Sequence, residues 1–313
     1  MPEYPDICVY IAALQRRVVG KRLTRLDVHG PSVLRTVSPR PERFAGTRLT
    51  GVARLGKRIV LEFEGDLKAA IHLMVAGRLH WRGRPPVMAR RADLAWFVFD
   101  DGCLILTEES TRKRAVIHLL EGPDAMDRLD AGGIDPMECT LNEFRKAIQR
   151  ENRTVKRTLT DPRLVSGIGN AYSDEILHRA RMSPFKRTQS LTDDEACRLH
   201  VATIEILTEW TERLMAETGD RFPERITAHR PEMAVHGRFG KPCPVCGTPV
   251  QRIVYAETEA NYCAECQMGG RLLADRALSR LLRSDWPATL TELEESTEQR
   301  RGRVIRRQDN GGF

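Results

Sequence analysis

Two pairs of cysteines near the C-terminus place the strongest constraint on how this 313-residue chain can fold. The pair Cys243-Pro-Val-Cys246 is followed, after sixteen intervening residues, by Cys263-Ala-Glu-Cys266. Two thiolate pairs at this spacing are typical of four cysteines that bind one zinc ion on paired β-turns. Because four protein ligands leave no open position, we expect this metal to be structural rather than catalytic. Iron in a rubredoxin-like site is the alternative that the spacing leaves open.

The rest of the composition describes a globular chain with a basic surplus. Lys and Arg number 50 against 43 Asp and Glu, which favours a polyanionic partner without establishing one. No apolar run approaches the roughly 20 residues that cross a bilayer, and the first residues lack the layout of a secretory signal. We therefore expect a cytoplasmic protein, nucleoid-associated in a bacterium, with no membrane partner. The unpaired cysteines are expected to be reduced core residues: Cys8, Cys103, Cys139 and Cys197.

The pattern of apolar residues predicts a β-sandwich with one helix in front of it. Apolar residues recur at helical spacing from Ile7 to Val18, with Asp6 placed to cap the first turn. Two strands are expected to meet at Leu55-Gly56-Lys57, since Gly56 can take the positive φ of a tight turn. Residues 68–81, KAAIHLMVAGRLHW, are a further strand candidate. Residues 92–109, ADLAWFVFDDGCLILTEE, predict a hairpin that turns at Asp101-Gly102.

A stretch rich in Gly, Pro and Asp then separates this part from a helical one. A capping box of Thr192 and Glu195 opens a long amphipathic helix. After the cysteines, GGRLLADRALSRLLRSDWP predicts a further helix, and the charged tail from about Thr291 is expected to be disordered. The expected division is a β-sandwich over residues 1–125, a linker over 126–140, a helical domain over 141–235, a zinc finger over 236–270, and a helical extension with a basic tail over 271–313.

The stretch LVSGIGNAYSDEILHRA places two glycines in front of a helix. Gly167 and Gly169 precede Asn170, which is suited to cap that helix. A Gly-rich turn at a helix N-terminus offers free backbone N–H groups to an anion. Upstream in the chain, Lys156 and Arg157 are placed to reach the same anion when it is a phosphate. An ordinary helix–turn–helix corner explains the glycines equally well, and a solvated helix face is the alternative for the two cations.

The first residues, Met-Pro-Glu, carry a different chemical signal. Methionine before proline is normally removed, which leaves Pro2 as an N-terminal residue with a secondary amine. An α-amino group has a pKa of about 8, so a useful fraction is neutral at physiological pH. Such an amine can attack a sugar C1′ and form an iminium ion, a covalent electron sink for β-elimination. Glu3 is placed beside it for general acid–base work.

Together these features resemble the formamidopyrimidine-DNA glycosylase / endonuclease VIII (Fpg/Nei) family. The likeness covers about residues 2–267 in the family's order: the terminal Pro-Glu, a strand hairpin with a lysine, a helix–two-turn–helix and a four-cysteine zinc finger. The resemblance implies an α+β protein with an N-terminal β-sandwich and a leading helix, a C-terminal helix–two-turn–helix domain and a β-hairpin zinc finger. We expect a monomer that binds damaged, abasic or single-stranded DNA and carries one structural Zn²⁺.

The resemblance also implies roles for residues at matching positions. Pro2 takes the place of the Schiff-base nucleophile, and Glu3 that of the acid/base that opens the deoxyribose. Lys57, in LGKRIVLEF, stands at the hairpin lysine that contacts phosphate near the lesion and assists elimination. The alternative for Lys57 is a solvated lysine in a turn. Asp6 stands where the family usually has a glutamate in an orienting role.

The DNA-binding residues are assigned in the same way. Lys156 and Asn170 match phosphate-gripping residues of the helical domain, and Gly169 belongs to the glycine turn beside them. Arg112 falls near the family's Arg-Phe pair, within Thr111-Arg112-Lys113, where it can serve in part although no aromatic residue stands there.

In the family, three residues fill the void that the everted base leaves in the duplex. The chain departs from the family at these three positions. Val75 takes the place of the family's methionine, and Met74 is one position away, which on a strand would face the other side. With Arg112 but no aromatic wedge, this trio is incomplete. Thr258 and two glutamates replace the arginine of the finger hairpin.

We therefore expect a base-excision repair glycosylase with AP-lyase activity, with a preference for single-stranded or distorted DNA. An unpaired base costs less to extrude than a paired one, so an incomplete wedge matters less there. A non-catalytic damaged-DNA-binding protein on the same scaffold is the first alternative, favoured by the altered wedge and the acidic finger tip. A zinc-ribbon adaptor for other proteins is the second, and it leaves the terminal Pro-Glu without a role.

Overall fold

The computed structural model describes residues 1–224, 226–227, 230–255, 258–273, 287–292 and 295. The chain divides into two compact units. The sandwich unit comprises Met1–Arg153, Arg157–Gly169 and Thr203–Ala228, and the finger unit comprises Thr154–Lys156, Asn170–Ala202 and His229–Phe313. The domain limits expected from the sequence stay a prediction.

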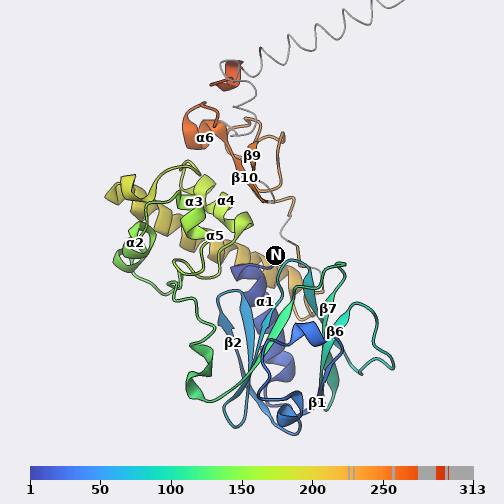
Figure 1. The fold of residues 1–313 in the computed structure, drawn as a ribbon. Coiled ribbons are helices and arrows are strands. Elements are labelled where there is room, and N and C mark those ends of the chain that lie inside the picture. The colour runs from blue at the N-terminus through green and yellow to red at the C-terminus, as the bar shows by residue number, and fades with distance from the viewer. Residues whose placement is uncertain (225, 228–229, 256–257, 274–286, 293–294, 296–313) are drawn as a thin grey trace, which may run out of the picture. The chain divides into compact units, whose positions relative to one another are not determined.

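Two antiparallel sheets make up the sandwich unit (Figure 1). Its strands are β1 (Leu23–Val28), β2 (Leu49–Leu55), β3 (Arg58–Phe63), β4 (Leu67–His72), β5 (Gly77–Arg82), β6 (Asp93–Phe99), β7 (Gly102–Glu108) and β8 (Val116–Glu121). One sheet has the order β2-β3-β4-β8 and the other β1-β6-β7-β5. Ile59 and Ile71 of the first sheet share an apolar core with Leu79 and Phe97 of the second. This confirms the expected sandwich, in which the inner faces of two sheets interdigitate.

Helix α1 (Tyr4–Val18), blue in Figure 1, packs against β2 and β3. Glu3 is its N-cap, and the Glu3 N–H donates to Asp6 Oδ2 at 2.9 Å, which closes the first turn as a capping box. The inner face of the helix, including Tyr10 and Leu14, belongs to the apolar core. Residues 1–3 therefore lead directly into a helix whose position is fixed by the burial of its inner face.

The expectation of one strand over residues 68–81 is wrong. The segment forms β4 and β5, which belong to different sheets, and a turn joins them in which Met74 has φ +53°. Apolar residues continue through this turn, so hydrophobic periodicity did not reveal it. Val75 and Met74 therefore lie in a turn, and the rule that neighbours on a strand face opposite sides does not apply to them.

Two glycines at the hairpins have different roles. Gly56 has φ +60°, as expected for the turn between β2 and β3. The second hairpin turns at Asp100-Asp101, one residue earlier than expected, because Gly102 already pairs with Phe99 in the ladder. A Cβ on Gly102 would lie 2.2 Å from the ring of Trp81, so packing rather than turn geometry requires this glycine.

The remaining elements are mostly helical. The capping box of Thr192 and Glu195 is confirmed, with N–H bonds of 2.9 and 3.2 Å in the two directions. The predicted helix over GGRLLADRALSRLLRSDWP and the tail from about Thr291 lie largely outside the described residues. The elements are η1 (Pro31–Val33), η2 (Pro41–Phe44), η3 (Pro123–Met126), α2 (Leu141–Gln149), α3 (Val155–Leu159), α4 (Asn170–Arg179), η4 (Thr188–Ser190), α5 (Asp193–Thr218), β9 (Gln251–Tyr255), β10 (Thr258–Tyr262) and α6 (Ala264–Met268), and β9 and β10 pair antiparallel.

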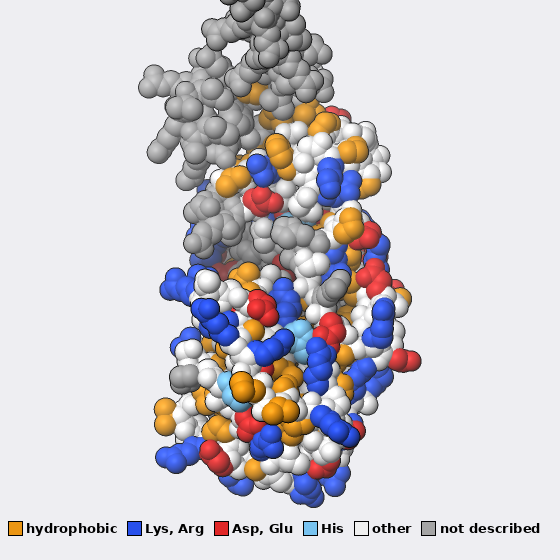
Figure 2. Space-filling model, turned by 90° about the vertical axis from the view of Figure 1, so that its right-hand side faces the viewer, with side chains coloured by type: hydrophobic (Ala, Val, Ile, Leu, Met, Phe, Trp, Pro, Cys, Tyr) orange, Lys and Arg blue, Asp and Glu red, His pale blue; other side chains and the backbone are white. Residues whose placement is uncertain are grey.

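Among the described residues, no helix is both long and apolar enough to span a membrane. On the face drawn in Figure 2, Lys and Arg side chains are spread among Asp and Glu, and those described there do not merge into one continuous basic patch. Surface charge on this face therefore does not by itself mark a binding site.

Candidate catalytic site and metal centre

Gly169 is the point on which the candidate catalytic side chains converge. Its N–H donates to Glu3 Oε2 at 2.6 Å, and Glu3 is buried, with 2% of its surface exposed. A Cβ built on Gly169 would lie 2.5 Å from the carboxyl carbon of Glu3 and 2.8 Å from Lys57 Nζ. Any side chain at position 169 would therefore displace both groups. The sandwich unit thus brings together three of the residues that the sequence singled out.

The glycine turn also holds the N-terminal segment through its backbone. Tyr4 N–H donates to Gly167 O at 2.9 Å. Gly167 has φ +84°, and a Cβ there would lie 3.0 Å from the Tyr4 ring. The anion bound by the Gly169 N–H in this structure is the protein's own Glu3 carboxylate, so a contact of Gly169 with DNA phosphate stays a prediction. Pro2, two residues before the start of α1, is buried.

Burial changes the proton affinity of the amines in this site. It lowers the pKa of the α-amino group at Met1 below its ordinary value of 8.0, while the Glu3 carboxylate opposes the shift. Burial likewise lowers the pKa of Lys57 from 10.5, again opposed by Glu3. Each shift increases the neutral fraction of an amine near pH 7, the form that has a free electron pair.

Arg54 on β2 links the two sides of this site. Its Cζ lies 4.2 Å from the centroid of the Tyr4 ring, a cation–π contact. Its Nη1 donates to Gly56 O at 3.1 Å, directly before Lys57, and its Nη2 forms an ion pair with Asp135. One guanidinium therefore ties the residue after Glu3 to the turn that carries Lys57. Sequence reasoning missed Arg54 because no motif marks a contact between such distant parts of the chain.

Lys156 and Asn170 lie together in the finger unit. Lys156 Nζ donates to Asn170 O at 3.2 Å and to Ser173 Oγ at 3.1 Å, and it forms an ion pair with Asp174. These three acceptors match the three hydrogens of an ammonium group. Asp174 is buried and also bonds His236 Nδ1 at 2.8 Å. The lysine is thus fixed at the first turn of α4, where the helix dipole favours an anion.

Arg112 lies in an exposed loop that a buried carboxylate organises. Glu108 is 1% exposed and accepts the N–H groups of Arg114 at 2.7 Å and Ala115 at 2.9 Å. The loop presents Arg112 and Arg114 to solvent and contains no aromatic residue. Val75, in the turn between β4 and β5, is 55% exposed. At the positions where the family's void-filling residues would lie, the chain therefore presents cations and one small apolar side chain.

The paired cysteines, none of them in a disulfide, gather into one cluster in the finger unit. The Sγ atoms of Cys243 and Cys266 are 3.9 Å apart, and those of Cys246 and Cys263 are 3.4 Å apart. A tetrahedral zinc ion with Zn–S bonds of about 2.3 Å separates its sulfur ligands by about 3.8 Å. The four cysteines therefore fit the structural zinc ion that their spacing predicts.

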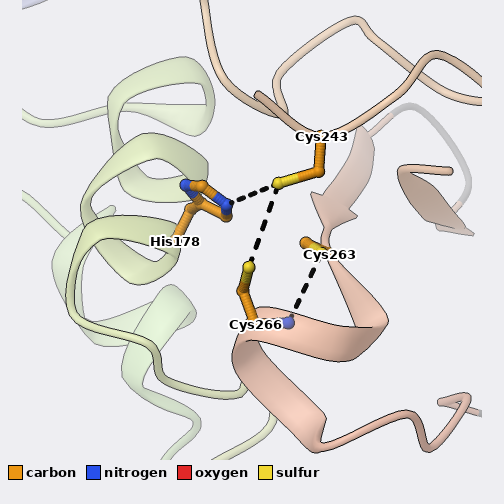
Figure 3. Close-up of side chains that lie close together, drawn as sticks. All are labelled: His178, Cys243, Cys263 and Cys266. Carbon is orange, nitrogen blue, oxygen red and sulfur yellow. Dashed lines mark hydrogen bonds between the residues drawn. The ribbon is translucent and has the colours of Figure 1, made fainter. Parts of the chain in front are cut away.

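His178 on α4 joins this cluster, which the sequence analysis did not foresee (Figure 3). Its Nε2 lies 3.3 Å from Cys243 Sγ. The donor atoms of His178, Cys243, Cys263 and Cys266 all lie within 4.8 Å of one another. Burial lowers the pKa of His178 to about 4, with Arg179 and Arg181 adding to the shift, so the ring is neutral at pH 7. The histidine is far from the cysteines in the chain, so no spacing motif includes it.

Models of three sequence domains match successive parts of the chain. They are the formamidopyrimidine-DNA glycosylase N-terminal domain over residues 1–116, the formamidopyrimidine-DNA glycosylase H2TH domain over 133–219, and the zinc finger found in FPG and IleRS over 240–267. A formamidopyrimidine-DNA glycosylase of Thermus thermophilus is 30% identical over 279 residues, which cover 86% of this chain and all of that one. The chain belongs to the formamidopyrimidine-DNA glycosylase family.

Solved structures related to the family have the same fold. The structure of MutM in complex with carbocyclic 8-oxo-G containing DNA has a TM-score of 0.76 at 25% identity, over 85% of this chain and 100% of that one. Lactococcus lactis formamidopyrimidine-DNA glycosylase bound to DNA with an AP site has a TM-score of 0.74 at 25% identity, over 85% and 99%. An uncharacterized formamidopyrimidine-DNA glycosylase-like protein of Mycobacterium tuberculosis is 36% identical over 151 residues, which cover 48% of this chain and 94% of that protein.

Membership in the formamidopyrimidine-DNA glycosylase family confirms the resemblance and the α+β fold expected from it. It makes the protein a DNA-repair glycosylase that binds DNA. The zinc-finger match and the thiol cluster confirm structural zinc. The roles of individual residues stay predictions.

Proposed function

We propose that the protein is a bifunctional glycosylase and AP lyase that uses Pro2 as its nucleophile. One observation carries the proposal: the Glu3 carboxylate and Lys57 Nζ approach the same point above Gly169, and Glu3 directly follows Pro2 in the chain. A buried carboxylate and a desolvated lysine of lowered pKa, close to the residue that becomes the N-terminus, suit Schiff-base chemistry. A protein that only bound DNA would need none of these three groups at one point.

The proposed steps use the side chains of the sandwich unit. After removal of Met1, the Pro2 nitrogen forms a bond to C1′ while the bond from C1′ to the damaged base breaks, and the base leaves with a proton. Glu3 gives a proton to the ring oxygen, which opens the deoxyribose and leaves an iminium ion. Loss of a proton from C2′ then breaks the bond between C3′ and the phosphate oxygen. Water hydrolyses the iminium ion and frees Pro2.

The other residues act on phosphates or on geometry. Lys57 neutralises a phosphate near the lesion and assists elimination, and Asp6 orients Glu3 through the Glu3 N–H. Asn170 contacts the DNA backbone at the first turn of α4, and Lys156 fixes that turn while adding positive charge. Arg112 contacts the DNA from the loop that Glu108 holds.

We further propose that the enzyme prefers single-stranded or distorted DNA. Val75 and the loop of Arg112 present no aromatic wedge to fill the space of an extruded base. The cost of unpairing, a few kcal/mol, is then poorly offset in a matched duplex and is absent in a single strand. Equal cleavage rates on one lesion in matched duplex and in single strand would contradict this preference.

A non-catalytic damaged-DNA-binding protein is the second candidate. Glu259 on β10 supports it, since this carboxylate lies on the finger hairpin, 3.9 Å from Arg252, where a phosphate would be repelled. A chain that bound abasic DNA without cleaving it would fit that function.

Strand cleavage by a Glu3→Gln variant tests the catalytic proposal. The substrate is an end-labelled oligonucleotide with one abasic site, and a second carries an oxidised base. We expect cleavage by the parent protein and a loss of at least about 100-fold in the variant, since positioned acid–base groups contribute 10²–10⁴-fold. Glu64→Gln, which removes a surface carboxylate near Arg48, is the control and should retain the parent rate. Parent-like cleavage by Glu3→Gln would overturn the assignment.

A further inference from the structure

The metal centre has five donor side chains rather than four. Cys243, Cys263 and Cys266 share a cluster with His178, whose imidazole nitrogen lies within 4.8 Å of each of their sulfurs. Cys246 reaches the same cluster through Cys263, with the two sulfurs 3.4 Å apart. Zinc in a structural site takes four ligands, and both Cys₄ and Cys₃His sets are common. Three thiols are thus common to two complete ligand sets, one closed by Cys246 and the other by His178.

The two candidates for the fourth position differ in burial. Cys246 is exposed, whereas Cys243 and Cys263 are buried and Cys266 is half-buried. His178 is also buried, with 7% of its surface exposed. Cys246 is therefore the ligand that solvent, or a competing thiol or chelator, reaches first.

His178 is held beside the cluster by contacts that do not involve the metal. Glu175, on the same helix, accepts the backbone N–H groups of Ala234, Val235 and His236 at 2.7, 2.9 and 2.9 Å, which ties the segment before Cys243 to α4.

A second contact ties the far end of the finger to the residues after α4. Gln267 Nε2 donates to Met182 O at 2.7 Å, and the Cys263 N–H donates to Gln267 Oε1 at 2.9 Å. The imidazole is therefore positioned in advance and needs no rearrangement of the backbone to reach the metal.

We propose that His178 is an alternate fourth ligand, which replaces Cys246 when that thiolate leaves the zinc ion. In the exchange a Zn–N bond to the imidazole forms, the Zn–S bond to Cys246 breaks, and the released thiolate takes a proton from water. The three shared cysteines keep their bonds, so the finger stays folded. This inference rests on the zinc finger alone and does not depend on the proposed chemistry of Pro2.

Metal retention by cysteine variants of the full chain tests the exchange. The variants are Cys246→Ala, Cys263→Ala, His178→Ala and the double variant Cys246→Ala/His178→Ala, each measured for zinc per chain and for zinc release to a chromogenic chelator. We expect Cys246→Ala to keep one zinc ion and the double variant to release it at least about tenfold faster. Cys263→Ala removes a shared ligand and leaves Cys246, whose sulfur lies outside the group of donors that includes His178. This variant should therefore lose the metal whether or not His178 is present.

Cobalt(II) substitution gives a readout that does not depend on affinity. The sulfur-to-cobalt charge-transfer band should be weaker in Cys246→Ala than in the parent protein, and the d–d bands should shift as one nitrogen replaces one sulfur. Circular dichroism of each variant identifies chains that fail to fold. Release of zinc from Cys246→Ala as fast as from Cys263→Ala would overturn the proposal. Equal release from folded Cys246→Ala and from the double variant would overturn it as well.

Discussion

The guanidinium of Arg54 lies on the ring of Tyr4, with Cζ 4.2 Å from the ring centroid. The same group donates to Gly56 O and pairs with Asp135, so three separate segments meet at one side chain. Tyr4 follows Glu3, and Gly56 precedes Lys57. Arg54 therefore sets the position of the candidate acid relative to the candidate lysine.

Substitution of Arg54 should slow cleavage more than it weakens DNA binding. A displacement of about 1 Å in a catalytic group can cost about 100-fold in rate, so we expect Arg54→Gln to lower kcat by roughly 10- to 100-fold with little change in KM. Initial rates of cleavage of abasic DNA at a series of substrate concentrations measure both. Arg48→Gln, which removes a surface ion pair to Glu64 just before β2, is the matched control. A rise in KM with kcat unchanged would show that Arg54 contributes to DNA binding rather than to positioning.

Gly169→Ala should abolish cleavage without unfolding the chain. The new Cβ would lie 2.5 Å from the Glu3 carboxyl carbon and 2.8 Å from Lys57 Nζ, so both side chains must move. Gly83→Ala adds the same methyl group where no heavy atom lies within 4 Å, and it should be neutral. Cleavage assays beside thermal unfolding separate the two effects. Normal activity of Gly169→Ala would mean that Glu3 and Lys57 do not act from their positions in this structure.

The decline of the cleavage rate at alkaline pH should follow the loss of the positive charge of Lys57. Burial lowers the pKa of this lysine from 10.5, against the opposing effect of Glu3, so its positive charge is present below the lowered pKa and is lost as pH rises through it. Arginine stays charged at every accessible pH. We therefore expect Lys57→Arg to cleave more slowly at neutral pH but to lose the alkaline decline. An unchanged alkaline limb in this variant would assign the decline to another group.

Acid should destabilise the sandwich unit through His72. Burial, and then Arg58, Lys57 and His118, lower the pKa of His72 to about 4, and its Nδ1 accepts the Met74 N–H at 2.9 Å. The unfolded chain takes up this proton near pH 6.5 and the folded chain only near 4, so stability falls as pH drops between these values. The loss is up to about 3 kcal/mol. Denaturant unfolding of the parent and of His72→Gln from pH 7 to 4 should show a smaller decline in the variant. An equal decline in the free energy of unfolding of the two proteins would contradict the role of His72.

The sequence was informative where chemistry depends on spacing along the chain. The cysteine pairs, the terminal Pro-Glu and the glycine turn each lie within a short stretch, and together they pointed to the family and to structural zinc. Contacts between distant segments left no such pattern. Arg54 with Tyr4, and His178 with Cys243, are visible only once the chain is folded.

The turn at Met74 shows a different limit. Residues 68–81 are continuously rich in apolar side chains because β4 and β5 both contribute to the core, and the turn between them contains no Asn, Asp or Pro to mark it. Met74 takes φ +53° without being a glycine. Periodicity alone therefore joined two strands into one, and the side on which Val75 emerges was set by the turn rather than by alternation.

Borohydride trapping on abasic DNA, followed by mapping of the modified residue, tests the central claim most directly. Protein whose mass confirms removal of Met1 is reduced in the presence of single-stranded and duplex abasic DNA, and its tryptic peptides are analysed by mass spectrometry. The account predicts a stable adduct on the peptide that begins with Pro2, and much weaker trapping by Glu3→Gln. An adduct on a lysine such as Lys57, or correctly processed protein that binds abasic DNA and never traps, would contradict it.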